Sequence, residues 1–259
     1  MSITAHCVVK NEEVFIEYAI LSVIDFVDTI LVYDTGSTDH TPSLIQKLVA
    51  QFPRKIIFEE KGECDQARHT QLRQEMLDKT TTEWFMVLDG DEVWTNENMK
   101  EVLRVMREKP SIVCIMAPFY LCVGDIYHQT RKKGSIEMLG RKDFFYPRFI
   151  KITDGVHWSG NYNEDTLQNK NGEIFFTIAN SYTLTSRYWH MTHLKRSVND
   201  GEVYSSGGTR AQKRKITYFL IGKKINHPLP EVLQGSLIKK LPWFRSFINF
   251  FQLLIQRYI

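Results

Sequence analysis

Apolar runs that are too short for helices recur through the first part of the chain, with amphipathic segments between them. In the clearest run, Trp84–Leu88, the apolar residues are unbroken and the sequence then turns abruptly acidic. A short run of this kind is typical of a strand buried on both faces, as in a parallel sheet. The strands expected from such runs are Ile3–Val9, Thr29–Tyr33, Arg54–Glu60 and Trp84–Leu88, with helices over Val14–Phe26, Thr41–Gln51 and Cys64–Leu77.

The alternation of strands and helices predicts the fold class. Short connections between alternating β and α segments indicate an α/β protein with a doubly wound, mostly parallel sheet. Thr41 is expected to cap the second helix, because Pro42 after it favours the first helical position. The later pattern predicts a helix over Asn96–Glu108, a strand over Ile112–Pro118, and a hairpin in which Arg148–Ile152 pairs with residues 156–158.

Polar clusters follow three of the predicted strands. They contain Asn11 and Glu12, residues 34–39, and Asp89 with Asp91. Parallel strands that alternate with helices end at one edge of the sheet, and open α/β sheets bind their ligands at that edge. The clusters are therefore expected to meet in one site.

The Asp89-Gly90-Asp91 sequence suggests what this site holds. In extended backbone the two carboxylates point to the same side, and the glycine between them lets a ligand approach closely. Clustered hard oxygen ligands suit Mg²⁺ or Mn²⁺, which proteins commonly share with substrate phosphates. A divalent-metal and diphosphate site is one interpretation, and an acidic turn after a core strand is the other.

Several other classes of site lack their signatures. No G-x-G-x-x-G follows the first predicted strand and no G-x-x-x-x-G-K-[ST] occurs, which disfavours dinucleotide-binding and P-loop enzymes. The four cysteines form no C-x-x-C pair and are expected to be reduced thiols of a cytoplasmic protein. Neither a signal peptide nor an apolar run of transmembrane length is expected, and no nucleic-acid partner is expected.

Four motifs, in this order, resemble glycosyltransferase family 2, the inverting enzymes of the GT-A fold: Val9–Glu13, Asp34–Asp39, Gln66–His69 and Asp89–Asp91. The similarity covers about residues 1–195, with a nucleotide-sugar-binding half over 1–118 and a smaller, β-rich acceptor side over 119–195. The resemblance implies a metal-dependent transferase. It would move a sugar from a nucleoside-diphosphate sugar, more specifically a UDP- or GDP-sugar, to a hydroxyl of a glycan or lipid-linked acceptor in cell-envelope synthesis.

The resemblance also implies which residues bind the donor and the metal. Residues expected around the donor are Val9, Asn11, Glu12, Asp34, Gln66, Arg68, Asp89 and Gly90. The expected ligands of the Mn²⁺ or Mg²⁺ ion are Asp89, Asp91 and His190.

A catalytic base is expected further along the chain. The family pattern that begins near Pro147 usually ends in His-Glu, and here Asn163 stands in place of the histidine before Glu164 and Asp165. Inversion is a single displacement, so one carboxylate must take the acceptor proton while a metal offsets charge on the leaving diphosphate. Glu164 and Asp165 both remain candidates for the base. A non-catalytic nucleotide-sugar or glycan-binding protein on the same fold is the alternative.

Residues 196–259 are expected to form a basic, helical C-terminal extension. Residues 210–259 contain ten Lys and Arg but only one acid. Over Trp243–Ile259, polar residues at helical spacing form a narrow stripe on an apolar helix. Such a helix, with the lysines before it, can lie on an anionic membrane through residues 239–259, which would make the protein peripheral at the inner face. The alternatives are docking on its own domain or on a second copy in a homodimer.

Overall fold

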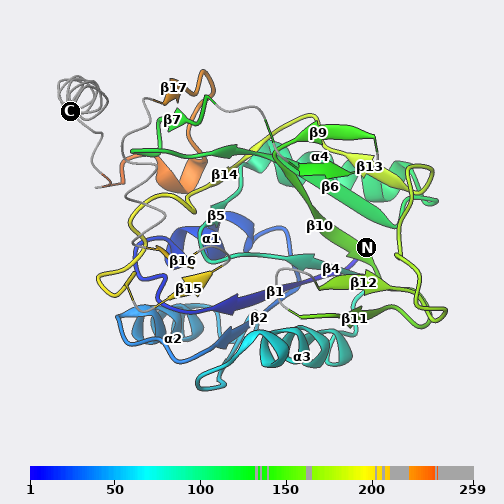
Figure 1. Cartoon of the computed structure of the whole chain (residues 1–259), viewed down its shortest axis with the longest axis horizontal. Coiled ribbons are helices and arrows are strands. Elements are labelled where there is room, and N and C mark those ends of the chain that lie inside the picture. The colour runs from blue at the N-terminus through cyan, green and yellow to red at the C-terminus, as the bar shows by residue number, and fades with distance from the viewer. Residues whose placement is uncertain are drawn as a thin grey trace, which may run out of the picture.

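A computed structural model of the chain describes residues 1–131, 134, 136–138, 140–161, 165–201, 203–205, 208–210, 222–236 and 238. A mixed sheet forms its centre, made of β1 (Ile3–Val9), β2 (Thr29–Asp34), β3 (Ile56–Glu60), β4 (Trp84–Val87), β5 (Glu92–Val93), β6 (Cys114–Leu121), β10 (Phe145–Lys151), β13 (Ser181–Thr183) and β14 (Tyr188–His190). The order across the sheet is β3-β2-β1-β4-β10-β6-β14-β5, with β13 beside β6 (Figure 1).

Helices and short hairpins surround this sheet. The helices are α1 (Ile16–Val23), α2 (Thr41–Gln51), α3 (Gln66–Asp78) and α4 (Asn96–Glu108), with a 3-10 turn, η1 (Glu231–Leu233). The remaining short strands are β7 (His128–Gln129), β8 (Ile136–Met138), β9 (Arg141–Asp143), β11 (His157–Ser159), β12 (Thr166–Gln168), β15 (Tyr204–Ser205), β16 (Gly208–Thr209) and β17 (Lys223–Lys224).

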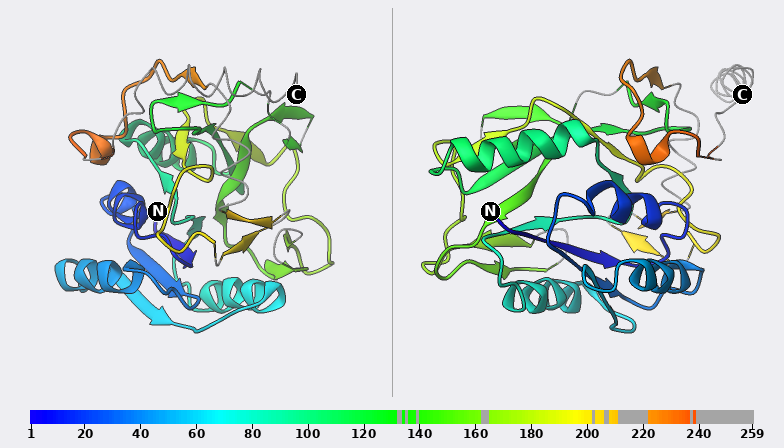
Figure 2. Two further views of the ribbon diagram at one scale, coloured as in Figure 1. Left: turned by 60° about the vertical axis from the view of Figure 1, so that its left-hand side comes forward. Right: turned by 180° about the vertical axis from the view of Figure 1, so that it is seen from behind.

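Different helices cover the two faces of the sheet (Figure 2). Ala5 and its alternate neighbours in β1 pack into the main core with α1, α2 and α4. On the opposite face, Leu31 and Tyr33 of β2 pack against Leu72 and Met76 of α3. Since successive strand residues point to opposite faces, only unbroken apolar runs can bury both faces in this way. The predicted α/β class with helices on both faces is confirmed.

The sheet is parallel in its N-terminal half and mixed beyond it. β3, β2, β1 and β4 are parallel, whereas β10 runs antiparallel to both β4 and β6. The predicted hairpin of Arg148–Ile152 with residues 156–158 is therefore wrong, because β11 pairs with β12 instead. Phe149 and Ile150 of β10 are fully buried, which places this strand inside the sheet, while β11 is only half buried and lies outside it.

The start of α2 also differs from the prediction. The helix begins at Thr41, and His40, not Thr41, holds the N-cap position. The Thr41 hydroxyl instead accepts a hydrogen bond of 2.7 Å from the backbone N–H of Glu12. The hydroxyl oxygen that was expected to cap the helix therefore makes a tertiary contact. This hydrogen bond fixes the loop that carries Glu12.

The predicted helix Asn96–Glu108 is confirmed as α4, and one buried carboxylate fastens it to the chain before β14. The Glu101 Oε1 atom accepts hydrogen bonds from the Thr185 N–H and hydroxyl, both at 2.9 Å. The Oε2 atom accepts from the Ser186 hydroxyl at 2.8 Å and from its N–H at 3.2 Å. These bonds fix the segment that leads into Tyr188–His190.

In the described part of the chain, no helix is both long and apolar enough to cross a membrane. The expected helix over Trp243–Ile259 and its membrane contact through residues 239–259 lie outside the described residues.

We predict that Glu101→Gln lowers the free energy of unfolding at pH 7 by about 1–3 kcal/mol, because an amide N–H₂ must then face donors. Glu108→Gln is a matched control on the exposed side of α4, with an expected change below about 0.5 kcal/mol. Denaturant unfolding of both variants measures the change in the free energy of unfolding. Equal changes would contradict the conclusion that Glu101 fastens α4 to Thr185 and Ser186.

The effect of Glu101 is expected to depend on pH. Burial alone would raise its pKa, but the bonds from Thr185 and Ser186 hold the pKa below the ordinary 4.5. A depressed pKa stabilises the fold above pH 4.5, and this contribution is lost as the pH falls through the folded-state value. The stability difference between wild type and Glu101→Gln should therefore shrink below about pH 4.5.

Candidate functional site

A cavity of about 1320 Å³ lies at the carboxyl edge of the parallel strands. Its walls come from the ends of β1 and β4, from α3, from β10 and from the segment after β14. The polar residues among those that line it include Lys10, Glu12, Thr35, Asp65, Gln66, His69, Arg73, Asp89, Asp91, Arg148, Asp165, His190, Thr192, His193, Arg196 and Arg210. The polar ends of the predicted strands thus meet at one cavity, as parallel strand geometry requires.

The Asp89–Glu92 segment turns instead of continuing as extended backbone. The Glu92 N–H donates to the Asp89 carbonyl at 3.0 Å, which closes a turn. The expected extended backbone between Asp89 and Asp91 is therefore wrong, although both residues line the same cavity. Asp89 accepts a bond of 2.8 Å from Arg148, whereas Asp91 accepts one of 2.6 Å from Arg196.

Gly90 is required at the centre of this turn because there is no room for a side chain. A Cβ atom at this position would lie 2.9 Å from Cγ of Glu12 and 3.1 Å from Cγ1 of Val9. The turn thus packs directly on the residues that follow β1.

Three side chains at this turn could hold a metal ion. Asp89, Glu92 and His190 each offer one ligand atom, and these atoms lie within 4.8 Å of one another. In the described part of the chain, Glu92 Oε2 and His190 Nδ1 are buried without a hydrogen-bond partner. Buried polar atoms are normally paired, so two such atoms beside a carboxylate match the needs of a divalent cation. Asp91 remains close, with Oδ1 3.6 Å from His190 Nε2.

Sequence reasoning missed Glu92, although its signal was present. It directly follows the Asp89-Gly90-Asp91 motif, and it lies opposite His190 in the antiparallel pair of β5 and β14. Only the pairing of these two strands shows that the glutamate, like the histidine, faces Asp89.

Arg148 supplies the positive charge for Asp89 and Glu92. Its Nη2 atom donates to both carboxylates, and the Tyr188 hydroxyl donates to Glu92 Oε1 at 2.7 Å. Burial alone would raise the pKa of Asp89, but the Arg148 guanidinium holds it below its ordinary 3.8. Glu92 is more deeply buried, and burial raises its pKa to about 7 in spite of Arg148. The pair thus combines one ionised carboxylate with one that a cation would deprotonate.

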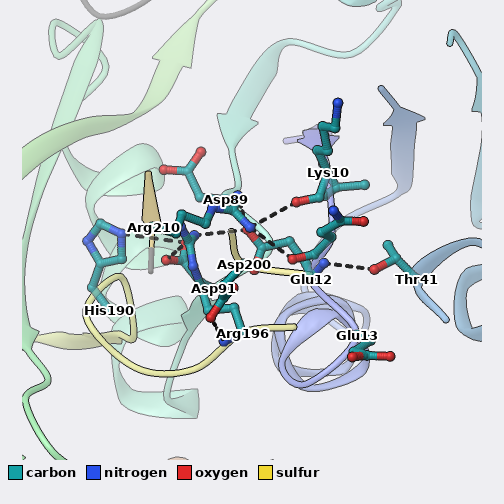
Figure 3. Close-up of polar contacts among 12 residues, drawn as sticks. Lys10, Glu12, Glu13, Thr41, Asp89, Asp91, His190, Arg196, Asp200 and Arg210 are labelled. Atoms are coloured by element: carbon teal, nitrogen blue, oxygen red, sulfur yellow. Dashed lines mark hydrogen bonds and ion pairs between the residues drawn. The ribbon is translucent and has the colours of Figure 1, made fainter. Parts of the chain in front are cut away.

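A second buried network joins Asp91 to Glu12 (Figure 3). The Arg196 Nη1 atom donates to Glu12 Oε1 at 2.9 Å and to Asp91 Oδ2 at 2.6 Å. Arg210 Nη2 lies 2.7 Å from the same Glu12 oxygen. Burial raises the pKa of Glu12 to about 7, while Arg196 and His190 overcome burial at Asp91 and lower its pKa.

Three residues expected around the donor do not line the cavity. Asn11 is fully buried, and its Oδ1 atom accepts from the Thr38 N–H at 2.8 Å. Asp34 Oδ1 accepts from the N–H groups of Gly36 and Ser37 at 3.0 and 2.9 Å. The Arg68 guanidinium instead donates to Glu75 Oε1 at 2.6 Å on α3. Asn11 and Asp34 hold the loop between β2 and α2 in place, while Val9, Glu12, Gln66, Asp89 and Gly90 do line the cavity.

One of the two candidate bases, Asp165, lies on the side of the cavity formed by β11 and β12. Asp165 lines the cavity, and its Oδ2 atom accepts a hydrogen bond of 2.6 Å from Arg73 of α3. The same guanidinium lies over the ring of Trp158, 4.8 Å from its centroid. Glu164 and Asn163 lie outside the described residues.

The mixed sheet with an acidic turn at its carboxyl edge defines an α/β protein of the GT-A type. Residues 5–190 match the model of glycosyl transferase family 2, and the chain belongs to this family.

Individual relatives agree with this assignment. Over 147 residues the chain is 31% identical to the SPbeta prophage-derived glycosyltransferase SunS of Bacillus subtilis (strain 168) and to glycosyltransferase SunS of Bacillus phage SPbeta. These matches cover 54% of this chain and 33% of each relative, so the chain spans about a third of their length. Among solved structures, S. aureus TarS shares the fold, with a TM-score of 0.51 and 14% identity over 74% of this chain and 37% of TarS.

We predict that Gly90→Ala lowers the free energy of unfolding by about 1–3 kcal/mol, because the added Cβ must displace Glu12 and Val9. Gly201→Ala is the matched control, since a Cβ there meets nothing within 4 Å. Its expected change is below about 0.5 kcal/mol. Denaturant unfolding measures both, and similar stabilities would show that the turn relaxes without cost.

Proposed function

We propose that this chain transfers a sugar, with inversion, from a nucleoside-diphosphate sugar to an acceptor hydroxyl with the help of Mn²⁺ or Mg²⁺. The observation that carries the proposal is the convergence of Asp89, Glu92 and His190 within 4.8 Å at the edge of a large cavity. Membership of glycosyl transferase family 2 supports the same reaction class.

The donor, a UDP- or GDP-sugar, would lie along the carboxyl edge of the sheet. Its nucleoside would lie toward Val9, Lys10 and Thr35, and its diphosphate toward Asp89 and Asp91. The position of this edge in an open α/β sheet supports the arrangement. Asn11 and Asp34 would not contact the donor but would position the loop that they hold. Arg68 would likewise act indirectly, through its contact with Glu75 on α3.

The metal ion would be held by Asp89, Glu92 and His190, with Asp91 as a further candidate ligand. When bound, the ion would offset the charge that develops on the leaving diphosphate. Arg148 would keep the Asp89 and Glu92 carboxylates in place, since it donates to both.

The acceptor would enter from the side of β11 and β12. Asp165, or its neighbour Glu164, would take the proton from the acceptor hydroxyl as the new bond to the anomeric carbon forms. Arg73 would orient Asp165 through the bond to Oδ2, which leaves Oδ1 to face the hydroxyl. Apolar side chains line this end of the cavity, which suits the ring faces of a glycan or the apolar part of a lipid-linked acceptor: Trp158, Leu167 and Phe176.

We predict that one nucleoside-diphosphate sugar raises the melting temperature only when Mn²⁺ is present. A ligand at 100 times its dissociation constant stabilises by about 2.7 kcal/mol, which corresponds to roughly 5–10 °C for a chain of this size. Asp89→Asn should abolish the shift. A thermal-shift screen with and without EDTA measures this. No shift with any nucleotide sugar would overturn the proposal, and a shift without sugar transfer would indicate a non-catalytic binding protein.

We predict that Asp165→Asn and Glu164→Gln differ strongly in transfer rate. Loss of a general base costs on the order of 10²–10⁴-fold in rate, while loss of a neighbouring carboxylate costs far less. The affinity for the donor should stay near that of the wild type in both variants. Steady-state transfer kinetics measure the difference, and equal, small effects would show that neither residue is the base.

A further inference from the structure

Arg196 lies where the nucleoside end of the cavity meets the turn that would hold the metal. Its Nη1 atom bridges Glu12, which follows β1, and Asp91, which follows β4, at 2.9 and 2.6 Å. The side chain is 9% exposed and lines the cavity. A diphosphate that joins a nucleoside near Lys10 to a metal near Asp89 must pass this guanidinium.

Arg210, which shares the partner Glu12 with Arg196, also binds the backbone that follows β1. Its Nη1 atom donates to the backbone carbonyls of Lys10 and Asn11 at 2.9 and 2.8 Å. Its Nη2 atom lies 2.7 Å from Glu12 Oε1. These contacts neutralise Glu12 independently of Arg196, so Glu12 keeps a counter-charge when Arg196 changes partner.

The charges around the cavity are formally balanced. Among the described residues that line it, five cations face five carboxylates: Lys10, Arg73, Arg148, Arg196 and Arg210 against Glu12, Asp65, Asp89, Asp91 and Asp165. With every carboxylate counted as ionised and every histidine as neutral, the lining has no surplus positive charge for a diphosphate while Arg196 is paired with Asp91. A divalent ion on Asp91 would make this guanidinium available, and its planar fork matches phosphate oxygens.

We propose that Arg196 binds the donor diphosphate and that Arg196 and the divalent ion compete for Asp91. This inference rests on the proposed function and assigns to Arg196 the phosphate contact of that site. Arg196 is the counter-cation of Asp91 in the structure described here. In the loaded site, Arg196 releases Asp91 to the divalent ion and turns to the phosphate oxygens.

The test is Arg196→Gln in two separate titrations, one with Mn²⁺ alone and one with inorganic pyrophosphate at a Mn²⁺ concentration that saturates the protein. Mn²⁺ should bind the variant roughly fivefold or more tightly than the wild type, because the competitor for Asp91 is gone. Pyrophosphate should bind roughly tenfold or more weakly, because a charge-assisted bond is lost. Calorimetry measures both affinities, and a variant that simply misfolds would lose both.

Two further variants sharpen the result. Arg196→Lys keeps the charge without the fork and should give intermediate values for both ligands. Arg104→Gln makes the same change of charge at the exposed Arg104–Glu108 pair on α4 and should match the wild type for both.

Three results would each overturn the proposal. One is unchanged pyrophosphate affinity in Arg196→Gln, and another is unchanged or weaker Mn²⁺ binding by an Arg196→Gln protein that still unfolds cooperatively. The third is a wild type that binds no pyrophosphate in the presence of Mn²⁺. The nucleotide-sugar screen on the wild type distinguishes failure of the Arg196 proposal from failure of the proposed function. A metal-dependent shift there, with Arg196→Gln behaving like the wild type in both titrations, would refute the Arg196 assignment alone. Absence of any shift would refute the donor.

Discussion

Carboxylates can be buried together at the end of this sheet because guanidinium groups are buried with them. Glu12, Asp91 and Glu92 are each at most 2% exposed, and each is paired with Arg148 or Arg196. An unpaired buried carboxylate would carry a desolvation cost of several kcal/mol, so neither partner can be removed alone without a large penalty. The ion pairs therefore tie the acidic turn to strands and segments that come much later in the chain.

Strand order decides which groups meet in the site. β10 lies between β4 and β6, and this position brings Arg148 next to Asp89. β14 pairs with β5, and the register of that pair sets His190 opposite Glu92. Glu101 of α4 holds the segment before β14 because its carboxylate accepts five hydrogen bonds from Thr185 and Ser186. The geometry of the metal-ligand candidates thus depends on contacts across the whole sheet.

Two of the structural errors from the sequence, the Thr41 cap and the hairpin, have one cause. Thr41 carries the side chain of a helix cap, but a loop distant in sequence uses its oxygen. Residues 148–152 and 156–158 are separated by a turn and suggested a hairpin. Instead β10 inserts between distant strands and packs Phe149 into one apolar cluster and Ile150 into another. Local propensity predicted the helices and strands well. It failed where the hydrogen-bond partner of a side chain, or the pairing partner of a strand, is distant in the sequence.

The sequence by itself determined the α/β class, the strands β1 to β4 and the gathering of their polar ends. Apolar periodicity is a local property, and strands that alternate with helices end at one edge of a parallel sheet. It also indicated Asp89, Asp91 and His190 as residues of the site. Only the tertiary structure decided that Glu92 joins Asp89 and His190, that Asn11 and Asp34 hold a loop, and that Arg148 and Arg196 carry the counter-charges. These roles arise from long-range strand pairing and charge burial, in which each partner is fixed by a segment far away in the chain.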